Sequence, residues 1–182
     1  MLSRRNFLKL TTGSVALASI APSIVLASSV DKSQMIPREI SLNNLHTGER
    51  LKTCFFDGEN FVEEALDDIA RLCRDFRRNE VFPIDKRLLV QLDNIRNQLG
   101  TTAEIQIISG YRSPATNEML AAKSGGVAKK SMHMRGKAID FRIPGVDLKK
   151  VQKVALAQKA GGVGYYEKSN FVHIDTGRVR FW

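Results

Sequence analysis

Three side chains in the last third of the chain have the residue types of a metal site. His133 and Asp140 lie seven positions apart, and His173 follows near the C-terminal end. Two imidazoles and one carboxylate on one ion leave a fourth position for water, which is the layout of a catalytic zinc site. An exposed Asp and two structural histidines are the alternative. The chain has only three histidines, and two of them lie near an aspartate in the sequence. This favours a shared site that binds one Zn²⁺.

Two predicted strands would position these ligands. Residues 137–143 alternate in polarity and place Asp140 on one strand face, with apolar side chains on the other. Residues 171–175 alternate in the same way and place His173 and Asp175 on one face. Adjacent strands could therefore present Asp140 and His173 to one point. His133 would arrive from the preceding loop, where Gly136 permits a tight turn.

The pattern around these residues is similar to that of a known family. It reads Ser131-x-His133-x-x-Gly136-x-Ala138-x-Asp140, followed by His173-x-Asp175. This pair resembles the motifs of the zinc D-Ala-D-Ala peptidase (M15-type) superfamily, and within it those of the YcbK/MepK-type murein endopeptidases. Further similar stretches are 43–49, 109–113 and 161–166. The resemblance implies one zinc ion, hydrolysis by metal-activated water, and the stem peptides and cross-links of peptidoglycan as substrate.

A metallopeptidase also needs a base that takes the proton of the attacking water. Many members of this superfamily carry an acid three residues before the last histidine, but here that residue is Asn170. Asp175 is the candidate catalytic base, because it shares a strand face with His173. Its alternative role is to orient a metal-bound His173. Glu167 is a third option and is otherwise a surface charge.

Four further residues are candidates for substrate binding. Arg112 follows a predicted strand, and its planar fork could bind a substrate carboxylate. Spacing alone favours a surface arginine, whereas the resemblance places this stretch at the substrate site. Tyr111 either packs or donates to substrate, and Ser131 either binds the substrate backbone or holds its loop. His46 lines the substrate groove, is a turn residue, or is a fourth metal contact.

The N-terminal segment has the pattern of an export signal. Arg4 and Arg5 precede an uncharged stretch at 10–27 that ends in small residues. The paired arginines resemble a twin-arginine signal, so we expect an exported, periplasmic protein. A permanent anchor is the alternative, but polar residues interrupt the stretch, and we expect no stable membrane span after the signal is removed. We divide the chain into a signal (1–27), a flexible lead-in (28–39) and a zinc peptidase domain (40–182).

Composition narrows the function classes further. The formal net charge is +9, and it stays positive without the basic residues of the signal. This charge suits an anionic partner such as a cell wall bearing carboxylates. No nucleic-acid motif is present, so we do not expect nucleic acid to be a partner. Cys54 and Cys73 could pair in an exported protein, although a buried free thiol is an equal alternative for Cys73.

The expected fold is α+β, with a small, mainly antiparallel sheet that carries the zinc site on one side and packs helices on the other. We expect a monomer. The leading function is a zinc-dependent murein endopeptidase. The alternatives are a D-Ala-type carboxypeptidase acting on stem peptides and a non-catalytic, zinc-containing wall-binding domain. The predicted strands are 40–45, 52–56, 104–109, 137–143 and 171–175, the last forming a hairpin with 178–182. The predicted helices are 61–76, 86–99, one from Pro114 and one after Asp147.

Overall fold

The structure is a computed structural model that describes residues 36–124 and 126–182. The predicted export signal and most of the predicted lead-in lie outside the described residues. The first strand begins at Arg38, two residues before the predicted domain boundary. Within the described ranges, no helix is both long enough and apolar enough to cross a membrane.

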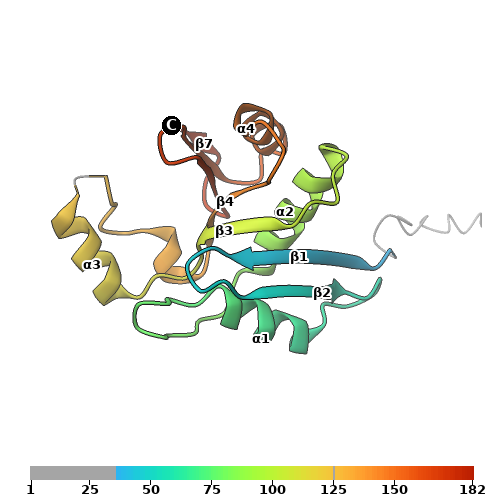
Figure 1. Ribbon diagram of the computed structural model, residues 1–182, viewed down its shortest axis with the longest axis horizontal. Coiled ribbons are helices and arrows are strands. Elements are labelled where there is room, and N and C mark those ends of the chain that lie inside the picture. The colour runs from blue at the N-terminus through green and yellow to red at the C-terminus, as the bar shows by residue number, and fades with distance from the viewer. Residues whose placement is uncertain (1–35, 125) are drawn as a thin grey trace, which may run out of the picture. The chain divides into compact units, whose positions relative to one another are not determined.

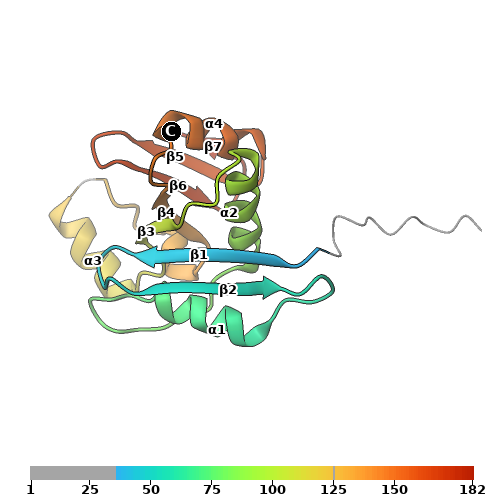
Figure 2. The same cartoon turned by 45° about the vertical axis from the view of Figure 1, so that its right-hand side comes forward.

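A seven-stranded sheet organises the described chain, in the order β2-β1-β3-β4-β6-β5-β7 (Figures 1 and 2). The strands are β1 (Arg38–Asn44), β2 (Arg50–Phe56), β3 (Ile105–Ser109), β4 (Ala138–Arg142), β5 (Gly162–Tyr166), β6 (Phe171–Asp175) and β7 (Arg180–Phe181). The helices are α1 (Glu63–Leu72), α2 (Lys86–Gln98), α3 (Pro114–Lys123) and α4 (Leu148–Ala157), with a short 3₁₀ helix, η2 (Met132–Arg135).

The sheet is mixed, which corrects the expectation of a mainly antiparallel one. Strands β1 and β3 are parallel, because α1 and α2 carry the chain from β2 back to the other side of β1. The predicted hairpin of 171–175 with 178–182 is also wrong. Both edges of β6 are occupied, by β4 and β5, so the last strand pairs in parallel with the open edge of β5. Strand β5 itself is absent from the predicted elements.

The two faces of the sheet have different roles. The alternation predicted for 137–143 is present in β4: Ile139 and Phe141 are fully buried in the hydrophobic core, while Asp140 points away from it. Helix α1 packs on β2, α2 on β1, and α4 on β5 and β6. Helix α3 stands apart from these three (Figures 1 and 2). Polar side chains can therefore gather on the face that the core helices leave free.

Side-chain caps start three of the helices at the predicted residues. Asp85 caps α2, Ser113 caps α3 with Pro114 in the first turn, and Asp147 caps α4. The cap at Ser113 fixes where the chain leaves β3, and Arg112 lies in that connection.

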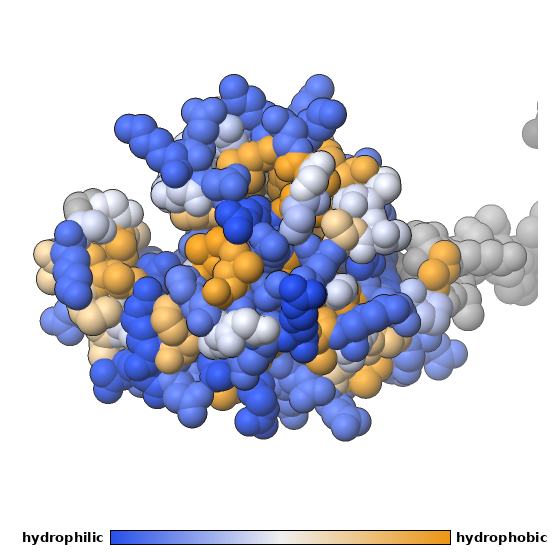
Figure 3. Space-filling model, in the orientation of Figure 1, coloured by the Kyte–Doolittle hydropathy of each residue, from blue (hydrophilic) through white to orange (hydrophobic). Residues whose placement is uncertain are grey.

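In the space-filling view, α3 forms a separate lobe with a hollow between it and the body of the protein (Figure 3).

Candidate metal centre

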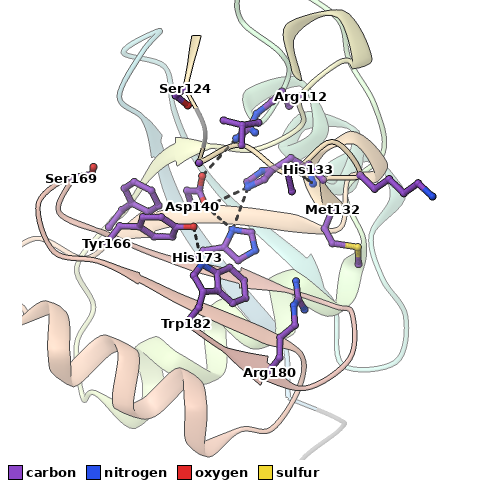
Figure 4. Close-up of a pocket in the computed structure, with 16 residues that line it drawn as sticks. Arg112, Ser124, Met132, His133, Asp140, Tyr166, Ser169, His173, Arg180 and Trp182 are labelled. Atoms are coloured by element: carbon purple, nitrogen blue, oxygen red, sulfur yellow. Dashed lines mark hydrogen bonds and ion pairs between the residues drawn. The ribbon is translucent and has the colours of Figure 1, made fainter. Parts of the chain in front are cut away.

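Three buried side chains meet on the free face of the sheet. Asp140 and His173 are register partners on the antiparallel strands β4 and β6, so their side chains emerge side by side. The His173 Nδ1 atom lies 2.7 Å from the Asp140 Oδ1 atom. His133 comes from η2, and its Nε2 atom is 3.3 Å both from His173 Nδ1 and from Asp140 Oδ1 (Figure 4). The structure thus brings together the three residues predicted as metal ligands.

The local sequence explains how η2 delivers His133. The Ser131 hydroxyl accepts a hydrogen bond from the His133 backbone N–H and so caps the short helix. Gly136 ends it in the left-handed conformation, with φ at +61°. A Cβ atom at Gly136 would collide with the Pro83 carbonyl oxygen. The tight turn between His133 and Asp140 therefore requires glycine for both conformation and space.

In each imidazole of the cluster, one ring nitrogen faces the other two residues of the cluster, and the other, outer nitrogen faces away from them and has its own partner. His133 Nδ1 lies 2.7 Å from the Gly110 carbonyl oxygen, and His173 Nε2 lies 3.1 Å from Asp175 Oδ2. Both partners are acceptors, so each outer nitrogen can carry the ring proton when the inner nitrogen binds a cation. The inner nitrogens then direct lone pairs at the same point as the Asp140 carboxylate. Such a convergence of electron-pair donors is suited to a cation.

The spacing of these donors fits a small divalent ion. Two ligand atoms on a tetrahedral zinc, each ~2.0–2.1 Å from it, lie about 3.3 Å apart. Two of the three separations in the cluster are 3.3 Å, and the third is a hydrogen-bond distance of 2.7 Å. All candidate ligand atoms lie within 4.8 Å of one another. The donor set of two nitrogens and one oxygen is also one that zinc favours.

The surroundings shift the pKa values of Asp140 and His173 in the direction that favours the charged form. Burial opposes ionisation of Asp140, but the neighbouring imidazoles of His133 and His173 hold the pKa of this carboxyl below its usual range. Burial likewise opposes protonation of His173, yet hydrogen bonds to the carboxylates of Asp140 and Asp175 raise the pKa of the imidazole. A carboxylate that stays ionised at neutral pH is the form needed to bind a metal.

Asp175 has the geometry of its alternative role, orientation of His173. Its carboxylate is fully buried and contacts the outer nitrogen of the ring, on the side away from the cluster. Its oxygens also accept from the Gly162 and Gly177 backbone N–H groups and from the Arg180 guanidinium. Burial opposes ionisation, but these donors hold the pKa of Asp175 well below its usual range. A saturated carboxylate that does not line the pocket is poorly placed to take a proton from water there.

Arg112 lies beside the cluster. Its backbone N–H donates to the His133 carbonyl oxygen, and its Nη2 atom lies 4.0 Å from Asp140 Oδ2. The side chain also donates to Asn117 and Ser109. Sequence reasoning missed the residue that holds this loop: buried Asp75 accepts from the Ser113 backbone and hydroxyl at 3.0 and 2.7 Å. Nothing in the local pattern around Asp75 indicates this long-range contact.

A pocket of about 350 Å³ opens onto the cluster and is distinctly basic. Arg112, Lys130 and Arg180 line it together with the three cluster residues and Ser131, and Asp140 is the one carboxylate in the described lining. Tyr166 and Trp182 also line it, and neither was predicted as a site residue. An anionic ligand would be attracted to this pocket.

Two residues predicted to bind substrate lie elsewhere. His46, at the turn between β1 and β2, stacks on Phe76 with ring centroids 4.3 Å apart. Tyr111 is buried and stacks on Phe82 at 4.8 Å, which is its packing alternative. Neither lines the pocket, and His46 is not in the cluster. Both side chains thus have the positions of their structural alternatives, a turn residue for His46 and a packing residue for Tyr111.

Both cysteines of the described chain are free. Cys73 is fully buried, and Cys54 is partly exposed and directs its thiol to the Phe56 carbonyl oxygen. Burial raises the pKa of the Cys73 thiol to about 12, so it behaves as an inert core residue. The position of Cys73 also excludes a side chain at Gly110, because a Cβ atom at Gly110 would lie 2.4 Å from the Cys73 carbonyl oxygen.

Comparison with known proteins identifies the family. The family model described as peptidoglycan L,D-endopeptidase MepK (Peptidase_M15_2) matches residues 32–182. The chain belongs to this family. It is 49% identical over 181 residues to the peptidoglycan L,D-endopeptidase MepK of Escherichia coli (strain K12), covering 99% of this chain and 97% of that one. The probable MepK of Haemophilus influenzae is 46% identical over 182 residues, covering 99% and 95%. The family resemblance inferred from the motifs is thereby confirmed.

We expect metal binding to depend on the two clustered histidines and not on the third. The variants His133→Ala and His173→Ala each remove one of three donors, so zinc should fall from about one ion per chain to a small fraction after dialysis. His46→Ala is the matched control and should keep its metal. Metal content by mass spectrometry checks this. Full zinc occupancy in either cluster variant, or loss in the His46 variant, would contradict the assignment.

The orienting role of Asp175 gives a separate expectation. Asp175→Asn can still accept at one oxygen but no longer fixes the His173 proton, so zinc affinity should fall about 10- to 100-fold. A base that does not contact the metal would lose turnover with unchanged zinc affinity. Competition titration against a chelator, alongside turnover at saturating zinc, separates the two outcomes. The second outcome would support Asp175 as the catalytic base.

Proposed function

We propose that this protein is a zinc metallopeptidase that hydrolyses peptide cross-links of peptidoglycan, as a murein endopeptidase of the L,D type. The observation that carries the proposal is the convergence of three inward-directed donors at the floor of a basic pocket. Membership of the MepK family supplies the substrate class, and the name of that family's relatives supplies the L,D specificity. The bond cut would join an L to a D stereocentre.

The residues of the site divide the work of such a hydrolysis. His133, Asp140 and His173 would hold the ion, which when bound acidifies a water and polarises the scissile carbonyl. Gly110 and Asp175 keep the two imidazoles in the tautomer that binds metal. Arg112, 4.0 Å from Asp140, would bind a carboxylate of the stem peptide next to the ion. Ser131 would act mainly through the η2 cap that positions His133.

In the described lining of the pocket, Asp140 is the only carboxylate, so no second one is available there to take the proton of the attacking water. Asn170 occupies the place of the expected acid and adopts a left-handed backbone at φ +52°. Glu167 is exposed, lies 4.0 Å from Lys149 and does not line the pocket. This gap is the reason that a non-catalytic, zinc-containing wall-binding domain remains a second candidate.

Cellular placement follows from the substrate. Peptidoglycan lies outside the cytoplasmic membrane, and relatives of this chain are named for acting on it. We therefore propose an exported, periplasmic protein, with residues 1–27 as a twin-arginine-type signal. The proposal includes a monomer with no nucleic-acid partner. Export in folded form would be compatible with metal loading before translocation.

Cleavage of defined muropeptides tests the function directly. We expect the zinc-loaded protein to convert an L,D-cross-linked muropeptide dimer into monomers, and a chelator to abolish this because the site then lacks its ion. Product analysis by liquid chromatography and mass spectrometry checks it. Release of a single terminal D-alanine instead would identify a carboxypeptidase. Zinc-dependent binding of the dimer without any cleavage would identify a wall-binding domain.

Arg112 should matter to the substrate and not to the metal. Arg112→Ala removes a charge-assisted contact, so kcat/KM should fall about 10- to 100-fold at unchanged zinc content. Arg135→Ala is the control, because that side chain is exposed and does not line the pocket. Steady-state kinetics on the same dimer provides the measurement. Equal kcat/KM in the two variants would remove Arg112 from the site.

A further inference from the structure

Strand β5 presents an unusual surface to the cluster. In register, Gly164 lies opposite His173 and Tyr166 lies opposite Phe171. The residues of β5 on the cluster face are therefore Gly162, Gly164 and Tyr166, because side chains alternate along a strand. Two positions without side chains next to a tyrosine leave room above the strand beside His173.

The end of the chain fills this room. Strand β7 pairs in parallel with β5, and Trp182 follows it. A Cβ atom at Gly164 would lie 2.7 Å from the Trp182 indole, so glycine is what lets the indole lie over the strand. There the indole centroid is 5.3 Å from that of the His173 ring, and the Arg180 guanidinium carbon is 4.9 Å from the indole centroid. The indole is thus packed between the imidazole and a cation.

Trp182 determines the hydrogen-bonding role of the Tyr166 hydroxyl oxygen. The indole Nε1–H donates to Tyr166 Oη at 2.8 Å, and an indole nitrogen can only donate. The tyrosine oxygen is therefore an acceptor in this pair, and its own proton must point elsewhere. Among residues 36–124 and 126–182, no acceptor for that proton is found within hydrogen-bond distance. The Tyr166 ring is held by stacking on Phe171 at 4.5 Å.

The Tyr166 hydroxyl faces the site. Tyr166 lines the same pocket as the three cluster residues, and its hydroxyl is turned toward His173 and Trp182 (Figure 4). Arg112 approaches the cluster from a different side (Figure 4). A neutral donor that is rigidly held next to a reacting carbonyl costs no reorganisation during the reaction.

We propose that Tyr166 is a catalytic residue whose hydroxyl donates a hydrogen bond to the scissile carbonyl oxygen, and that Trp182 is the positioning residue that directs this proton. The inference rests on the proposed hydrolysis. As the water oxygen bonds to the carbonyl carbon, the π electron pair moves onto the carbonyl oxygen. Tyr166 shares its proton with that oxygen and keeps it. No net proton transfer to or from Tyr166 is required.

Replacement of Tyr166 by phenylalanine tests the proposal in the zinc-loaded full chain. Tyr166→Phe should lower kcat for the cross-linked dimer about 10²- to 10³-fold, the usual effect of removing one oxyanion donor, with KM within threefold of wild type. Affinity for a phosphinate peptide, whose tetrahedral phosphorus replaces the scissile carbon, should fall by a similar factor in calorimetry. Zinc content should not change. Tyr165→Phe is the matched control, because that hydroxyl reaches Glu167 outside the pocket.

Trp182→Phe provides the second test and needs no change at Tyr166. Loss of the indole N–H should lower kcat and phosphinate affinity about three- to tenfold. In the double variant, kcat should be no lower than in Tyr166→Phe alone, because both changes act through one hydroxyl. Additive losses, or an unchanged kcat in Trp182→Phe, would overturn the positioning role.

The outcomes separate this inference from the proposed function. A wild-type protein that does not cleave the dimer counts against the hydrolysis itself. A wild-type protein that cleaves it, with Tyr166→Phe within threefold in both kcat and phosphinate affinity, overturns only the role of Tyr166. A parallel loss of zinc in Tyr166→Phe would likewise overturn it, since the residue would then be structural.

Discussion

The site depends on two hydrogen bonds that point away from it. The Gly110 carbonyl and the Asp175 carboxylate each hold the outer nitrogen of one imidazole, so the inner nitrogens of His133 and His173 face Asp140. Without these contacts either ring could rotate or change tautomer, and the cluster would be an ordinary hydrogen-bonded group. Much of the surrounding fold is arranged to make the two bonds possible. Gly110 packs against Cys73, and Asp175 is itself fixed by two backbone amides and Arg180.

Sheet order explains how distant parts of the sequence contribute to one pocket. Because β6 lies between β4 and β5, Asp140 and the β5 residues flank His173 on either side. Because β7 joins the outer edge of β5, Arg180 can reach Asp175, and Trp182 can reach Tyr166. The glycines of β5 permit both approaches. The C-terminal strand therefore supports the site from the side opposite to the Arg112 loop.

Local patterns predicted those parts of the fold and site that depend on one segment at a time. Alternation in 137–143 and 171–175 indicated the facing positions of Asp140 and His173, and three of the predicted helices begin at the expected residues. The parallel partners of β1 and β5 could not be predicted in this way, because strand order depends on which edges remain free. The contact from the Gly110 carbonyl to His133 could not be predicted either, because every residue has a backbone carbonyl and the residue type does not indicate which one is used. Asp175 shares a strand face with His173, and its burial and five hydrogen-bond donors favour the orienting role over that of a base.

The central claim is that one metal ion occupies the point where the three donors meet. Anomalous diffraction at the zinc absorption edge, from crystals of the zinc-loaded protein, tests this most directly. The account predicts a single anomalous peak ~2.0–2.1 Å from His133 Nε2, His173 Nδ1 and an Asp140 oxygen. A peak elsewhere, or a zinc bound through either outer ring nitrogen, would contradict it.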